Sequence, residues 1–118
     1  MKLAEILDRP EKWCKGTERL VNAFYGVQVC LNGALMAQNN PEFLTDQYYK
    51  WKSMDSCFLG FEKKLVRMDR AWKAVVPDHT KYSSHDVWQD QPETTFEEVQ
   101  RVVEEYDRLS ILEEGGEG

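Results

Sequence analysis

The sequence has few of the residues that usually organise a metal or disulfide site. Its three cysteines, Cys14, Cys30 and Cys57, include no Cys-x-x-Cys pair. Its two histidines, His79 and His85, lack the spacing of paired zinc ligands. Buried cysteine commonly acts as a small hydrophobic residue. We therefore expect no metal centre and no disulfide framework, and we expect the reduced thiols of a cytoplasmic protein.

Long apolar runs are also missing. No stretch approaches the roughly 18 apolar residues of a membrane-spanning helix. Glu5 and Asp8 interrupt the first ten residues, which lack the apolar centre of a signal peptide. These features predict a protein without a membrane span or a signal peptide.

Motifs of enzymatic chemistry are absent as well. The chain has no glycine-rich phosphate loop and no dinucleotide fingerprint. His79 and His85 lie beside Asp78 and Asp86, which would suit a general base, but no nucleophile with an orienting partner accompanies them. We therefore expect no catalytic residue and no cofactor, and we interpret the protein as a non-enzyme.

The sequence does contain enough apolar surface for one folded domain. Its 118 residues are 42% hydrophobic and include four Trp, which is sufficient for a single core. The net charge of −6 is uneven, because residues 93–118 hold nine acids and two Arg whereas the rest is nearly neutral. We predict a helical domain over residues 1–112 and a flexible acidic tail over 113–118.

A central helix is predicted over residues 28–38, the most apolar stretch of the chain. Gly33 lies inside this helix, where glycine lowers helix stability by about 1 kcal/mol relative to alanine. We therefore expect another element to approach the helix closely at Gly33. Gly33→Leu should therefore overpack that contact, and Gly33→Ala should be milder.

Further helices are predicted over 41–53, 57–76 and 95–110, because apolar residues recur in each with the helical period. Thr95 and Glu98 form a capping box at the start of the last helix. A short helix is predicted before Pro10. Residues 17–27 suit either a helix or an extended segment. Residues 78–92 are predicted to form a long ordered loop. The predicted fold class is an all-α bundle around the helix that contains Gly33.

Three groups of residues follow one another in a recognisable order. They are Trp13-Cys14-Lys15-Gly16, Cys30-Leu31-Asn32-Gly33-Ala34-Leu35, and Trp88-Gln89-Asp90 followed by Thr95-Phe96-Glu97-Glu98-Val99. This order resembles a family of small uncharacterised proteins of bacteria and their phages, classed as a domain of unknown function. Gln89 stands where the family often has Asn, and the segment before the central helix is shorter than usual. The resemblance implies a mostly helical, often phage-encoded protein and implies no activity.

The candidate contact residues are exposed charges and aromatics. The acidic helix offers a face that would suit a basic protein surface, and Tyr49 lies on the polar side of its helix near Lys52. A basic face with Lys63, Arg67 and Arg70 would suit phosphates, but the nearby acids disfavour nucleic acid. The predicted partner-binding residues are Tyr49, Lys52, Glu97, Glu104, Glu105 and Asp107.

We therefore expect a small interaction protein that binds another protein, without a membrane partner. Given the resemblance, we expect an accessory or inhibitory factor of phage or mobile-element type that occupies a host protein, such as a defence component. The alternative is a small-ligand-binding protein with a pocket near the 79–92 loop, formed by Tyr82, His85 and Trp88. The sequence does not define the oligomeric state.

Overall fold

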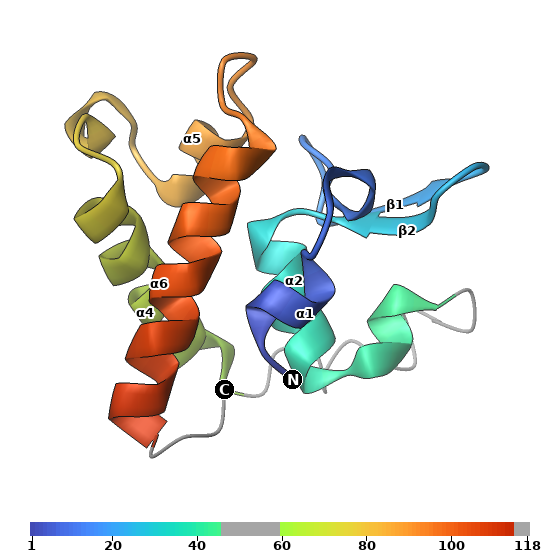
Figure 1. The fold of residues 1–118 in the computed structure, drawn as a ribbon, viewed down its shortest axis with the longest axis horizontal. Coiled ribbons are helices and arrows are strands. Elements are labelled where there is room, and N and C mark those ends of the chain that lie inside the picture. The colour runs from blue at the N-terminus through green and yellow to red at the C-terminus, as the bar shows by residue number, and fades with distance from the viewer. Residues whose placement is uncertain (46–59, 115–118) are drawn as a thin grey trace.

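The computed structural model describes residues 1–45 and 60–114; residues 46–59 and 115–118 lie outside the description (Figure 1). Among the described residues, no helix is both long enough and apolar enough to cross a membrane. The elements, in chain order, are α1 (Leu3–Ile6), the 3-10 helix η1 (Pro10–Lys12), β1 (Arg19–Asn22), β2 (Gly26–Val29), α2 (Leu31–Asn39), η2 (Pro41–Leu44), α4 (Phe61–Val75), η3 (His79–Lys81), α5 (His85–Gln89) and α6 (Phe96–Glu114).

The prediction of an all-α fold is wrong, because β1 and β2 form an antiparallel two-stranded sheet. The central helix begins at Leu31, and the expected helical residues Gln28 and Val29 belong to β2. Cys30 causes the difference: its backbone is extended and its Sγ accepts a hydrogen bond from the Gly33 N–H at 3.4 Å. Cys30 thus caps the first turn and ends the strand at the same position.

The turn between the strands explains why residues 17–27, which suited either a helix or an extended segment, fold as a hairpin. The Asn22 Oδ1 accepts hydrogen bonds from the backbone N–H groups of Phe24 at 2.8 Å and Tyr25 at 3.1 Å. Gly26 has a φ of +78°, the left-handed conformation that glycine adopts without steric cost. Asn22 and Gly26 therefore reverse the chain and set the pairing of Leu20 with Gln28.

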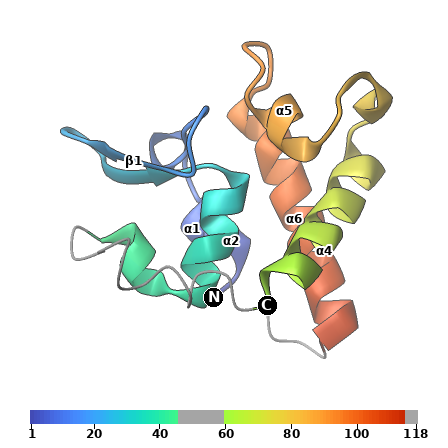
Figure 2. The same ribbon diagram turned by 180° about the vertical axis from the view of Figure 1, so that it is seen from behind.

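The core lies between two groups of helices. Helices α4 and α6 run side by side, and α1 and α2 pack against them, as Figures 1 and 2 show from opposite sides. The helical periods predicted for these segments are confirmed by burial of their apolar stripes, among them Met68 and Trp72 in α4 and Val99, Val102 and Tyr106 in α6.

Helix α6 begins with the predicted capping box. The Glu98 N–H donates to Thr95 Oγ1 at 3.3 Å, and the Thr95 N–H donates to Glu98 Oε1 at 2.9 Å. The helix continues to Glu114, so Glu113 and Glu114, which the sequence analysis assigned to the tail, belong to its last turn. These two acids contact α4, as described below.

The predicted loop over residues 78–92 contains two short helices, η3 and α5. Ser84 caps α5, because its Oγ accepts a hydrogen bond from the Val87 N–H at 3.4 Å. Of the helix predicted over 41–53, the described part is η2, which ends at Leu44, and the remainder lies outside the described residues.

Gly33 makes the close contact that its position in the sequence predicted, but the neighbour is a backbone carbonyl of the hairpin. A Cβ at this position would lie 2.9 Å from the Glu18 carbonyl carbon, and nearer still to the carbonyl oxygen. The same carbonyl accepts a hydrogen bond from the Cys30 N–H at 3.3 Å, so it belongs to the paired base of the hairpin. The contact therefore cannot relax by rotation of a side chain.

The sequence predicts only that Gly33→Ala is milder than Gly33→Leu; the backbone contact makes Gly33→Ala clearly destabilising in its own right. We expect a loss of about 1–3 kcal/mol in the free energy of unfolding, because a backbone shift outweighs the gain in helix propensity. Urea unfolding followed by circular dichroism measures this difference. A variant as stable as the wild type would show that the hairpin does not pack on the first turn of α2.

Candidate functional site

The three sequence motifs meet at the base of the hairpin. The Trp13 Nε1–H donates to Gln89 Oε1 at 2.7 Å, and the Gly16 N–H donates to Asp90 Oδ1 at 2.8 Å. The Lys15 ammonium reaches the carbonyl oxygens just beyond α5, including that of Thr94 at 3.0 Å. The segment before β1 is thereby held against α5, although the two are more than 70 residues apart in the sequence.

A second polar link joins α2 to α5. The His85 Nε2 lies 2.8 Å from Asn32 Oδ1 and 3.2 Å from Asp86 Oδ1, and the Asn32 Nδ2–H donates to Asp86 Oδ1 at 2.6 Å. Because both neighbours of Nε2 are acceptors, the neutral ring carries its proton there. Burial lowers the pKa of His85, and the carboxylates of Asp86 and Asp69 oppose that shift.

A polar hollow of about 150 Å³ lies between these links. Among the described residues, its lining includes three acidic residues and two with carboxamide side chains, and neither Lys nor Arg, so it would favour a small cationic group that donates hydrogen bonds. The lining residues are Gly16, Thr17, Glu18, Cys30, Asn32, Asp86, Gln89 and Asp90.

The two thiols near this hollow have low reactivity. Burial raises the pKa of Cys14 to about 11 and that of Cys30 to about 12, so both remain protonated at neutral pH. Within 1–45 and 60–114, no group of three or more His, Cys, Asp or Glu side chains is arranged to hold a metal ion. The Cys30 thiol, which lines the hollow, is therefore a poor nucleophile at neutral pH.

The residues predicted to form a pocket near the 79–92 loop are placed differently. His85 and Trp88 are buried in the core, where Trp88 is 2% exposed, and Tyr82 is half-buried beside it. None of the three lines the hollow, which uses their neighbours Asp86 and Gln89 instead. His85 is linked to it through Asn32 and Asp86.

Only part of the predicted acidic contact face on α6 is exposed to solvent. Glu97 and Glu104 are exposed, and Glu105 pairs with Arg108 at 2.6 Å on the same helix. Asp107 is buried, contrary to its predicted place on the outer face of α6. Tyr49 and Lys52 lie outside the described residues.

Asp107 instead holds the N-terminal helix in place. Its two carboxylate oxygens accept hydrogen bonds from the backbone N–H groups of Leu3 at 2.9 Å and Ala4 at 3.0 Å. Burial raises the pKa of Asp107, and these two hydrogen bonds oppose the rise. Periodicity did not reveal this role because the donors lie about a hundred residues away in the chain.

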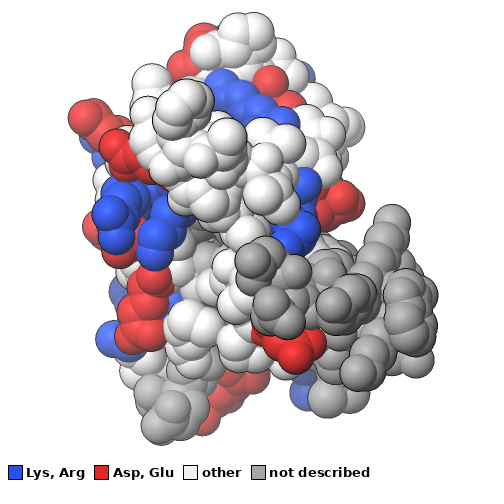
Figure 3. Space-filling model, turned by 90° about the vertical axis from the view of Figure 1, so that its right-hand side faces the viewer, with Lys and Arg blue, Asp and Glu red and all other residues white. Residues whose placement is uncertain are grey.

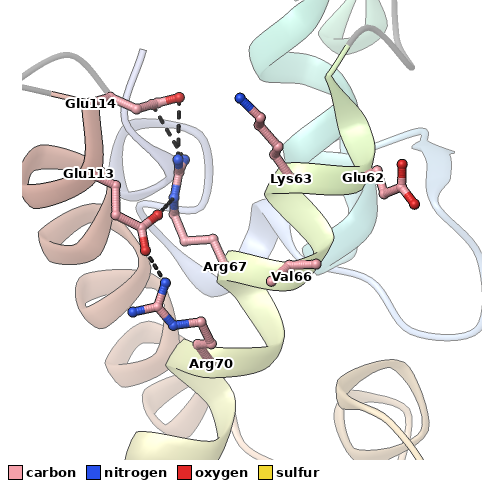
Figure 4. A pocket seen from close by; sticks show the side chains of 7 residues that line it. All are labelled: Glu62, Lys63, Val66, Arg67, Arg70, Glu113 and Glu114. Atoms are coloured by element: carbon pink, nitrogen blue, oxygen red, sulfur yellow. Dashed lines mark hydrogen bonds and ion pairs between the residues drawn. The ribbon is translucent and has the colours of Figure 1, made fainter.

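The predicted basic face is also interrupted by burial. Figure 4 shows that Arg67 of α4 points to the last turn of α6, where its guanidinium contacts Glu113 at 2.8 Å and Glu114 at 3.2 Å. It also donates to Tyr106 Oη at 3.3 Å and Ser110 Oγ at 3.2 Å. Arg67 is thus a structural link between the two longest helices.

Acids neutralise much of the remaining positive charge on this side of α4. Arg70 pairs with Glu113, and Glu62 and both terminal acids of α6 line the same hollow of about 500 Å³ as Lys63 (Figure 4). A phosphate backbone would meet carboxylates here. This arrangement adds no support for nucleic-acid binding.

The most exposed apolar surface lies on the segment whose conformation the sequence left open. We call β1, β2 and their turn the hairpin arm; it projects from the helices in Figures 1 and 2. Phe24, at its tip, is 91% exposed, and Leu20, Val21 and Tyr25 are exposed beside it. These four are among nine exposed large hydrophobic residues in the described part of the chain, so the apolar surface is concentrated here.

Cations lie close to the tip of the arm. A hollow of about 450 Å³ beside it is lined by Phe24 and Tyr25 together with Arg9, Glu11 and Lys12. Figure 3 faces the side of the molecule from which the arm projects and shows a broad uncharged area bordered by both basic and acidic residues. In the sequence, the uncharged and mostly apolar residues 20–25 before Gly26 were the available signal for this surface.

The fold and the site define a small, mainly helical protein with a projecting two-stranded arm. Comparison of the chain with family models, curated proteins and solved structures finds no match. The family resemblance therefore stays a prediction that rests on its motifs.

His85 should make stability depend on pH. Because its pKa is lowered in the folded state, the unfolded chain takes up a proton first, and the stability that neutral His85 contributes is lost as the pH falls below about 6.5. Urea unfolding at pH 7.5 and pH 5.5 should show a larger loss for the wild type than for His85→Gln. His79 is retained in both proteins, so equal losses would show that His85 does not carry the dependence.

Proposed function

We propose that this chain is a protein-binding module that uses the hairpin arm as its contact surface. The observation that carries the proposal is the 91% exposure of Phe24 at the tip of an arm whose neighbouring apolar side chains are also exposed. Single exposed apolar residues are normal on protein surfaces, but several of them gathered on one projecting element favour an interaction site. Aromatic side chains are also enriched at protein interfaces.

The anchoring of the arm supports this proposal. On one side of its base, the Cys14 N–H donates to the Val29 carbonyl at 3.1 Å, and Gln28 Nε2–H donates to the Glu11 carbonyl at 2.9 Å. On the other side, Arg19 donates to the Phe43 carbonyl at 2.8 Å. A fixed base with an exposed tip presents Phe24 at little cost in conformational entropy on binding.

The partner that we propose is a protein whose surface has an apolar recess, and Phe24 inserts into that recess. The accessory or inhibitory role expected for the chain is kept in this proposal and rests on the family resemblance. Cys14 and Cys30 are buried free thiols, which supports the cytoplasmic location that we also propose.

Phe24→Ser should abolish binding without affecting the fold, because the side chain is almost fully exposed in the free protein. A photoreactive benzoylphenylalanine at position 24 of the full chain should give discrete crosslinked adducts in a lysate of the native host. Excess wild-type protein should suppress these adducts, and excess Phe24→Ser should not. Leu112→Ser, which alters an exposed residue of α6, is the matched control and should compete like the wild type.

Competition by Phe24→Ser equal to that of the wild type would contradict the proposal, as would the same adducts from a photoreactive residue at position 112. Equal melting temperatures of the Ser variant and the wild type would confirm that any loss of binding is local to the tip.

The polar hollow favours a second candidate function, the binding of a small cationic ligand beside α5. Glu18 lines the hollow, and in the described part of the chain no salt bridge engages its carboxylate. This candidate keeps the expected location near the 79–92 loop but uses different residues.

Methylammonium should then shift the NMR signals of the Asn32 and Gln89 side-chain amides more than sodium at equal ionic strength does. Glu18→Gln should weaken this shift, because it removes one of the three carboxylates while the Glu18 backbone carbonyl remains. Equal shifts with both cations would eliminate the second candidate and leave the hairpin arm as the proposed site.

A further inference from the structure

We infer that Cys14 and Cys30 are a site of reversible oxidation, at which a small uncharged peroxide joins the two thiols in a disulfide across the base of the hairpin arm. In the structure both residues are free thiols, which is the reduced form of this site. The inference is independent of the proposed function, because it concerns the base of the arm and the proposed contact surface lies at its tip.

The backbone places the two cysteines side by side. Trp13 and Val29 form a parallel bridge, and the Cys14 N–H donates to the Val29 carbonyl at 3.1 Å. Trp13 and Cys30 have extended backbones, so the residues that follow the bridged pair point to the same face of it. Neighbouring strands lie about 4.8 Å apart, within the Cα separation of about 4.4–6.8 Å that a disulfide spans.

Weak hydrogen bonds hold the two sulfur atoms in the reduced form. The Cys14 Sγ–H donates to the Thr17 carbonyl at 3.5 Å, and the Cys30 Sγ accepts from the Gly33 N–H at 3.4 Å. A thiol is a weak donor, so turning the Cys14 side chain toward Cys30 costs little. A disulfide sulfur keeps its lone pairs, so Cys30 would continue to cap the first turn of α2.

The polar hollow gives an oxidant access to this pair. Both cysteines are buried, but Cys30 lines the hollow of about 150 Å³, and a space of this size admits a molecule as small as hydrogen peroxide. Glu18, Asp86 and Asp90 line the same hollow, and their charge disfavours an anionic oxidant such as oxidised glutathione. The class of oxidant that fits is therefore a small uncharged peroxide.

The reaction consumes one peroxide for each disulfide. The Cys30 thiolate attacks one peroxide oxygen, the O–O bond breaks, and the departing hydroxide takes up the thiol proton as water, which leaves a sulfenic acid on Cys30. The Cys14 sulfur then attacks the Cys30 sulfur, forms the S–S bond and expels hydroxide, which takes up the Cys14 proton as a second water. Two thiols are oxidised and the peroxide is reduced to two waters.

Burial slows this reaction without opposing its product. Burial raises the pKa of Cys14 to about 11 and that of Cys30 to about 12; the charge of Glu18 adds to both increases, and Cys14 adds to that of Cys30. Thiolate is therefore scarce near neutral pH, and the rate should rise about tenfold for each pH unit between pH 7.5 and 9.5. The disulfide carries no charge, so burial does not penalise it as it penalises the thiolate.

The disulfide would close a covalent loop around the whole hairpin arm. Both β1 and β2 lie between the two cysteines in the sequence. Closing a loop of roughly 15 residues restricts the unfolded chain, so the oxidised protein should melt about 10 °C above the reduced protein.

The test is oxidation of the chain with hydrogen peroxide at pH 8.5, followed by alkylation, tryptic digestion and mass mapping. We expect one pair of peptides joined through Cys14 and Cys30, with Cys57 alkylated, and dithiothreitol should reverse the link. Cys57→Ser is the matched control and should form the link and gain about 10 °C in melting temperature on oxidation. Cys14→Ser should form no link and show no such gain.

Mapping in the wild type requires no variant, so the result does not depend on whether Cys14→Ser folds. Recovery of Cys14 and Cys30 as free thiols, a link to Cys57 or to a second chain, or a sulfinic acid on Cys30 without a link would overturn the inference. A mapped link without a rise in melting temperature would also overturn it, because the native backbone would then not accommodate the disulfide. None of these results involves Phe24, so the proposed function is judged by its own crosslinking assay.

Discussion

One backbone contact, between the Glu18 carbonyl and Gly33, sets the arrangement of the candidate sites. The carbonyl is paired with the Cys30 N–H in the hairpin and rests on the first turn of α2, where a side chain at residue 33 would exclude it. This contact directs the arm away from the helices and places Asn32 against α5. A helix penalty of about 1 kcal/mol for glycine is thereby offset by packing that no other residue type would permit.

Two buried charged residues hold the helices around that contact. Asp107 joins α6 to the first residues of α1, and Arg67 joins α4 to the last turn of α6. Each is surrounded by hydrogen-bonding partners, as buried charges must be if their desolvation is to be tolerated. Both would be counted as surface charge from composition alone, so the acidic and basic faces of the folded protein are smaller than the sequence suggests.

The hairpin arm and the polar hollow share the same base but differ in chemistry. The hollow beside α5 is small, acidic and lined by side chains that already bond to one another. The arm is apolar, exposed and anchored through backbone carbonyls on both of its faces. Apolar area contributes most of the driving force for protein association, so the arm carries the proposed function and the hollow carries the alternative.

The sequence by itself determined the local features: the apolar periods of α4 and α6, and the capping box at Thr95. These depend on residues within a few positions of one another. Only the tertiary structure decided that residues 19–29 pair as strands, that Asp107 and Arg67 are buried, and that Phe24 is left in water. Short strands carry weak local preferences, and a charged residue at the edge of an apolar stripe is buried only when distant partners satisfy it. For Asp107 those partners are the amides of Leu3 and Ala4, which the fold alone brings within reach.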